Sequence, residues 1–236
     1  MSRAEPNTVP RAPHLGRVLR TSAEDLYYHG VRLVPTNVAW GLVVLAGLAL
    51  LSTPIVFVVL IALVPLTAGV MGMATTLVRS RTLVMSDFIG SIRPRLWAIV
   101  GIGIAQLVLV GVAAVDLLIG LQVGGFVGLI LTVTSAYTAI AIWLLAVVAW
   151  PLLLDPLRGD LGTRECLRLG LLLVVAHPVR IGLLALVVGA VFAASTVLLA
   201  AIVTFAVAFG FLVCAHYVLP AADRLEGRAT VEPAEG

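Results

Sequence analysis

The chain has 236 residues, of which 61% are hydrophobic and only 11% are charged. Soluble domains carry about a quarter charged residues, so this composition leaves too few charges to coat one and indicates a membrane protein. The net charge of +3 is too small to indicate a nucleic-acid partner, and we expect none.

The first 20 residues are predicted to form a disordered cytoplasmic tail. They are polar and contain several prolines, and they lack the apolar run and cleavage site of a secretory signal. The first apolar helix is therefore expected to stay in the protein as a signal anchor. Thr21-Ser22-Ala23-Glu24 has the pattern of a capping box, which predicts a short interfacial helix through about Leu33.

Long uncharged runs predict the membrane spans, because about 20 apolar residues are enough to cross the hydrocarbon core. Residues 33–78 carry no charge and are long enough for two spans, with a turn at 52–54 before the helix restarts. Residues 96–154 carry a single charge and are divided by the glycine-rich segment 120–125.

The last run, residues 181–222, is also long enough for two spans, and we place its turn at 194–196. An all-α membrane domain over residues 21–220 follows, with six transmembrane helices arranged as three hairpins. A disordered cytoplasmic tail is expected over 221–236. The predicted spans are 37–52, 55–78, 96–119, 126–150, 179–195 and 198–219.

The arginines predict the orientation of this domain. All 15 basic residues are Arg, and in the six-span topology all of them lie on one side of the membrane. The positive-inside rule assigns that side to the cytoplasm. We therefore expect a multi-pass protein of the cell membrane with both termini in the cytoplasm. Aromatic side chains at the same helix ends are interpreted as an interfacial belt: Trp40, Trp97, Trp150 and Tyr217.

Partly charged stretches before the hairpins predict short amphipathic helices that lie on the cytoplasmic surface of the membrane. Residues 86–93 precede the third span, and residues 163–168 begin a helix before the fifth. Arg side chains near such helices commonly reach lipid phosphates. The arginines predicted to do so are Arg79, Arg81, Arg93, Arg95, Arg164, Arg168 and Arg180.

Several short motifs carry a family resemblance. Asn37-Val38-Ala39-Trp40, Pro65-Leu66-Thr67-Ala68-Gly69 followed by Met73-Ala74-Thr75-Thr76, and Asp87-Phe88 followed by Arg93 to Trp97 occur in this order. In these motifs the chain resembles the YesL-like family, a group of bacterial membrane proteins of unknown function. The resemblance implies a six-helix domain in the bacterial cytoplasmic membrane. Through the gene context of that family it also implies an association with carbohydrate ABC-transport systems, and it brings no catalytic residue with it.

Polar residues inside the predicted spans are the candidates for a functional site. Gln106 lies about 15 Å into the third span, near the middle of the bilayer. Depth counting places three other polar residues at a similar level, which predicts a midplane polar cluster of Gln106, Thr67, Thr134 and Ser135. Such a cluster serves either as hydrogen-bonding glue between helices or as part of a substrate path; the sequence leaves both open.

Asp116 lies about 30 Å into the third span, at the expected outer interface. It is either a solvated helix end or an acid at the outer mouth of a proton or cation path. Cys166 and Cys214 are expected to form no disulfide. The sequence contains no metal-ligand spacing around them and no catalytic motif. We therefore expect no catalytic residue, no metal and no cofactor.

Two hypotheses for function remain open. The first is a non-enzymatic accessory or regulatory component of a transport system, with carbohydrate uptake suggested by the resemblance. The alternative is a small stand-alone transporter or channel that uses the midplane cluster. The expected partners are the lipid bilayer, transport-system subunits and a second copy of the chain.

Overall fold

A computed structural model describes residues 14–50, 52–197 and 205–227. All regular structure in these ranges is helical, which confirms the all-α prediction. Five helices there are long and apolar enough to cross a membrane: Leu15–Ala49, Ile55–Ser80, Ser86–Val123, Gly125–Leu153 and Pro178–Ser195. The structure is thus that of a membrane-type helical protein, with five candidate spans where the sequence predicted six.

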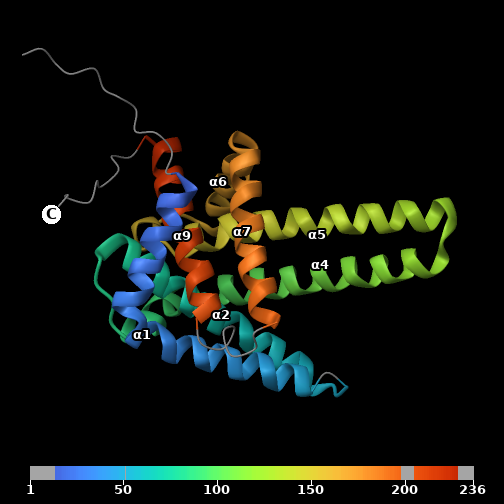
Figure 1. Cartoon of the computed structure of the whole chain (residues 1–236), viewed down its shortest axis with the longest axis horizontal. Helices are drawn as coiled ribbons and strands as arrows, with labels where there is room; N and C mark the ends of the chain where they lie inside the picture. The colour runs from blue at the N-terminus through green and yellow to red at the C-terminus, as the bar shows by residue number, and fades with distance from the viewer. Residues whose placement is uncertain (1–13, 51, 198–204, 228–236) are drawn as a thin grey trace, which may run out of the picture.

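Helix α1 (Leu15–Ala49) joins two elements that the sequence separates. The predicted interfacial helix and the first span form one continuous helix, which begins at Leu15 inside the predicted tail. Pro35 lies within it, and a proline inside a helix removes one backbone hydrogen bond and favours a kink. Figure 1 shows α1 changing direction part of the way along its length. A capping-box pattern therefore does not start a helix here, because the helix is already under way.

Helix α2 (Ile55–Ser80) follows a turn at residues 52–54, as predicted. It is followed by the short helix α3 (Ser86–Ile92) and a 3-10 turn, η1 (Arg93–Arg95). Two glycines of α2 allow α3 to pack closely: a β-carbon at Gly69 would overlap the Phe88 ring, and one at Gly72 would overlap Ser91. The amphipathic stretch 86–92 thus lies against α2.

Helices α4 (Leu96–Val123) and α5 (Gly125–Leu153) form a long hairpin that extends away from the rest of the molecule (Figure 1). The turn needs only Gly124 and Gly125, which both have φ near 62°. This left-handed conformation is one that glycine adopts at little cost. Near the turn the two helices touch through Gly120 and Gly128, where a β-carbon on either would overlap the other helix.

The C-terminal half follows the predicted order, with a helix that begins at 163 and a long helix that begins at Pro178, but two of its boundaries differ. A 3-10 turn, η2 (Pro156–Arg158), leads to α6 (Thr163–Ala176) and α7 (Pro178–Val197). The predicted turn at 194–196 is wrong, because α7 continues through it. Helix α9 (Val207–Leu225) ends at Leu225, inside the predicted tail, and residues 1–13, 51, 198–204 and 228–236 lie outside the described part of the chain.

Helix α9 is the centre of the packing. It contacts α1, α2, α5 and α7, and most of its side chains are buried. Small residues on several sides, such as Ala208, Gly210 and Ala215, let neighbouring helices approach it. In Figure 1, α7 and α9 run across the direction of the α4–α5 hairpin instead of along it. The core therefore forms around α9. Helix α1 packs against α2, α4 against α5 and α7 against α9. Residues 198–204 between α7 and α9 lie outside the described part of the chain, so the arrangement as six spans in three hairpins stays a prediction.

Candidate functional site: a charged cluster and a tryptophan chamber

Five charged side chains meet where α2, α5 and α9 end, and we call them the charged cluster: Arg79, Asp155, Arg158, Asp223 and Glu226. Arg79 Nη2 donates to Asp155 Oδ2 at 2.7 Å, and its Nη1 donates to Asp223 Oδ2 at 2.7 Å. Arg158 Nη2 donates to Asp223 Oδ1 at 2.7 Å and to Glu226 Oε2 at 2.9 Å, and Arg158 also pairs with Asp155.

The charged cluster is buried. The side chains of Asp155 and Arg158 are both 0% exposed, and that of Asp223 is 6% exposed. Burial alone would raise the pKa of Asp223, but hydrogen bonds and charge from Arg79 and Arg158 outweigh it and hold that pKa below its ordinary value. Buried charges of this kind are costly unless paired. Each arginine is held between at least two carboxylates, so the charges in this cluster are paired.

Arg95 holds the segment that carries Asp155 and Arg158. Its guanidinium donates to the carbonyl oxygens of Leu153, Arg158, Gly159 and Leu161 at 2.6–2.7 Å. Carbonyls at the end of α5 and in the following turn have no partner within a helix, so a cation that binds several of them fixes the local backbone. Arg95 at the start of α4 thereby holds the segment on which the charged cluster depends.

Three further contacts attach α1 and α2 to the same core. His216 Nε2 on α9 lies 2.8 Å from Asp25 Oδ2 on α1. Asn37 Oδ1 accepts a hydrogen bond from the Ala208 backbone N–H at 2.9 Å. Thr75 Oγ1 on α2 donates to the Leu154 carbonyl at 2.9 Å. Polar side chains on these largely apolar helices thus form hydrogen bonds that join one helix to another or to the segment after α5.

A cavity of about 320 Å³ lies beside this core, and we call it the tryptophan chamber. Its walls come from α1, α2, α4, α5, α7 and α9, and they include Trp40, Trp143, Trp150, Phe192, Phe211 and Gln106. The Trp40 indole N–H donates to Thr67 Oγ1 at 2.8 Å, that of Trp150 to Gln106 Oε1 at 2.9 Å, and that of Trp143 to the Ala185 carbonyl at 3.1 Å. The chamber is therefore aromatic and apolar, with its indole donors bonded.

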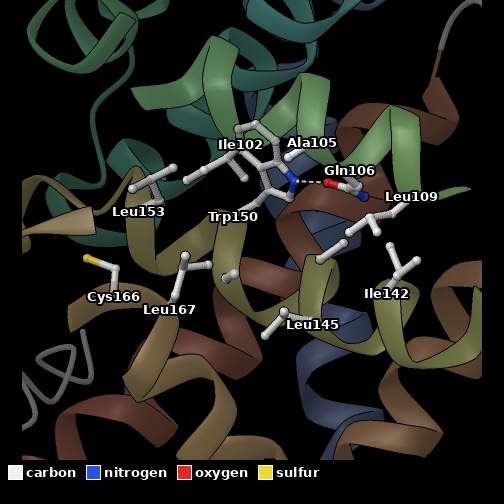
Figure 2. A pocket seen from close by; sticks show the side chains of 12 residues that line it. Ile102, Ala105, Gln106, Leu109, Ile142, Leu145, Trp150, Leu153, Cys166 and Leu167 are labelled. Carbon is white, nitrogen blue, oxygen red and sulfur yellow. Dashed lines mark hydrogen bonds between the residues drawn. The ribbon is translucent and has the colours of Figure 1, made fainter. Parts of the chain in front are cut away.

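A second cavity of about 220 Å³, the outer chamber, lies between α4, α5 and α6. The two chambers share Gln106, Ala146 and Trp150 as wall residues. Figure 2 shows the outer chamber with the hydrogen bond from Trp150 to Gln106 at its edge. This bonded pair therefore lies where the two chambers adjoin.

The structure brings together half of the predicted midplane cluster. Gln106 and Thr67 both line the tryptophan chamber. Thr134 is exposed and Ser135 is buried elsewhere on α5, and neither lines a chamber. The depth estimate was wrong because α4 and α5 have 28 and 29 residues, about 42 Å each, and so exceed the hydrocarbon core. Residues that lie equally far from opposite ends of two such helices therefore do not lie at the same depth.

The predicted lipid-binding arginines fall into two groups. Arg79 and Arg95 bind carboxylates and carbonyls inside the protein, and Arg81 lies 3.5 Å from Asp25. These contacts replace the lipid contacts expected of Arg79 and Arg95. The others are exposed, so lipid contact stays a prediction for them: Arg93, Arg164, Arg168 and Arg180. Asp116 is half-buried beside a hollow between α2 and α4, and its role also stays a prediction.

Two features were missed by sequence reasoning. Trp40 and Trp150 were interpreted as belt residues, but they line the tryptophan chamber, and Tyr217 is buried; Trp97 is 85% exposed, as a belt residue would be. The charged cluster was missed because only polar residues inside the predicted spans were considered as candidates, and its three acidic residues lie outside those spans. The available signal was that Asp155 and Asp223 follow apolar runs on the side predicted to hold every arginine.

Cys166 and Cys214 are buried, free cysteines, as expected. Within the described ranges, no group of three or more His, Cys, Asp or Glu side chains is placed to hold a metal ion. No protein-family model, curated protein or solved structure matches the chain.

Proposed function

We propose that the chain is a multi-pass protein of the cell membrane with six spans and cytoplasmic termini. Support for this topology comes from the charged cluster, which joins the ends of α2, α5 and α9. These ends close the second, fourth and sixth predicted spans, so in this topology they share one side. If α7 crosses to the far side, the chain must cross once more before Asp223 can reach Arg79.

We further propose that the protein acts without enzymatic chemistry, as an accessory or regulatory component associated with a transport system. The observation that carries this proposal is the charged cluster, in which buried ion pairs hold the ends of three helices together. Groups used in this way hold helices together and do not bind a passing solute. The association with transport, and with carbohydrate uptake in particular, comes from the resemblance to the YesL-like family.

The test is affinity purification of the full chain from native membranes in a mild detergent. We expect co-purification of a membrane permease, with a tagged, unrelated membrane protein of similar size as the control. Robust flux of sugars or ions by the purified protein in liposomes would overturn the accessory proposal.

A small stand-alone transporter or channel is the second candidate. The observation that favours it is that Gln106 and Thr67 line the same chamber. If this candidate is correct, Gln106→Leu abolishes flux in liposomes, whereas Gln122→Leu leaves it unchanged, because Gln122 is exposed close to the α4–α5 turn. Equal flux from both variants would reject a path through the chamber.

A further inference from the structure

The tryptophan chamber has the size and lining of a ligand site. Apolar cavities of about 150 Å³ stay dry and accept benzene-sized molecules, and this one measures about 320 Å³. Ligand pockets are typically apolar and aromatic, with a small number of polar groups that orient the ligand. Trp40, Trp143, Trp150 and two phenylalanines supply the aromatic walls.

Gln106 supplies the orienting polar group. An indole N–H can only donate, so the Trp150 hydrogen bond identifies the Gln106 oxygen as its acceptor. The amide nitrogen of Gln106 then points away from Trp150, on the side of Leu109 and Ile142 (Figure 2). Within the described residues this nitrogen has no hydrogen-bond partner. A donor in apolar surroundings favours a ligand that brings an acceptor.

The outer chamber provides the approach. Leu109 and Ile142 line it, and Leu109 is 52% exposed on α4, a helix apolar enough to cross a membrane. A ligand that reaches Gln106 by this route comes from the hydrocarbon of the bilayer and not from water. It must therefore dissolve in lipid.

We propose that the two chambers form one binding site for a lipid-soluble molecule with a carbonyl group. The carbonyl oxygen accepts a hydrogen bond from Gln106 Nε2, and the apolar body packs among the tryptophans. An alkyl quinone and a fatty ester share this chemistry. The site does not depend on the proposed partnership with a transport system.

Intrinsic fluorescence tests the proposal, because three of the four tryptophans line the tryptophan chamber and the fourth, Trp97, is exposed. The full-length Trp97→Phe protein, in detergent micelles, is titrated with three quenchers: a decyl-substituted benzoquinone, a dibromo fatty acid methyl ester, and a dibromoalkane of the same length without a carbonyl. We expect saturable quenching by at least one of the two carbonyl compounds, and whichever binds more tightly identifies the source of the ligand.

Two variants locate the site. Gln106→Leu should weaken binding of the carbonyl ligand about tenfold and leave the weak effect of the alkane unchanged, with Gln122→Leu as the matched control. Ala146→Leu adds bulk to the shared wall and should weaken binding about tenfold. Ala141→Leu, at an exposed position on the same helix, should not.

Gel filtration and thermal unfolding check that each variant is folded; if Ala146→Leu fails this check, Gln106→Leu decides the question. Quenching that is linear in all three compounds would overturn the proposal. So would saturable quenching that is the same in folded Gln106→Leu and Gln122→Leu.

Discussion

The charged cluster and the tryptophan chamber are built largely by the same helices, yet they are opposite in character. Helices α2 and α9 contribute to both, and α5 lines the chamber while the turn that follows it supplies Asp155 and Arg158 to the cluster. In the charged cluster each arginine is paired with at least two carboxylates, so removing any one side chain leaves another charge without one of its partners. In the tryptophan chamber the walls are neutral and about 320 Å³ stays open. The comparison indicates that ion pairs can fix the ends of α2, α5 and α9 while a cavity stays open between other parts of the same helices.

The largest effect is expected from Arg158→Leu. Removing this guanidinium takes one partner from each of the buried carboxylates of Asp155 and Asp223, and the loss of a buried ionic partner typically costs about 3–5 kcal/mol of folding free energy. Unfolding of the purified protein in a detergent titration measures the loss. Arg20→Leu is the control, since its pair with Glu24 is exposed, and it should unfold like the wild type. A stable Arg158→Leu protein would show that the cluster does not hold the helix ends.

A smaller loss is expected from Arg95→Leu. Arg95 binds four backbone carbonyls, and a hydrogen bond to a charged group contributes about 1.5–3 kcal/mol. The neighbouring Arg93 is exposed, so Arg93→Leu tests the loss of charge alone. The thermal unfolding midpoints of the two variants should differ clearly. Equal midpoints would mean that the segment after α5 keeps its shape without Arg95.

Acid should weaken the charged cluster before it affects the tryptophan chamber. The pKa of Asp223 is lowered in the folded protein, whereas an unfolded Asp has a pKa near 3.9. Its stabilising effect is therefore complete above about pH 4 and is lost as the pH falls through the folded pKa. We expect the thermal unfolding midpoint to decrease as the pH is lowered through this acidic range. Asp223→Asn should flatten that dependence, whereas Trp150→Phe should lower the whole curve without changing its slope.

The smallest effect is expected at the wall of the tryptophan chamber. Trp150→Phe removes the hydrogen bond to Gln106 Oε1, and such bonds between membrane helices contribute about 1 kcal/mol or less. Trp97→Phe is the control because Trp97 is exposed. The difference between the two midpoints measures the bonded pair. A loss as large as that of Arg158→Leu would remove the contrast between the two regions.

The helices that the sequence predicts best are those bounded by clear chemical signals. The turn before Ile55 and the start of α4 after Arg95 were placed correctly, because a proline interrupts the first uncharged run and an arginine comes directly before the second. The turn predicted at 194–196 had no such signal and falls inside α7. Continuity through Pro35 was also missed, because a proline in a sequence indicates a helix start as readily as a kink.

The charged cluster could not be derived from local pattern. Arg79 is separated by 76 residues from Asp155 and by 144 from Asp223, and no periodicity relates positions so far apart. The tryptophan chamber was partly foreseen, since Gln106 and Thr67 were both singled out. Their partners Trp150 and Trp40 were assigned to the interface, because an aromatic residue near a helix end suits a belt or a core equally well.

The close packing of α3 on α2 has a consequence for sequence variation. Gly69 leaves room for the Phe88 ring, and a β-carbon at that position would overlap it. Homologous chains that carry a larger residue at position 69 should therefore carry a smaller one at position 88, so that the summed volume stays nearly constant. Position 72 and its neighbour at 91 should show the same exchange, which makes these two pairs a molecular signature of the α2–α3 contact.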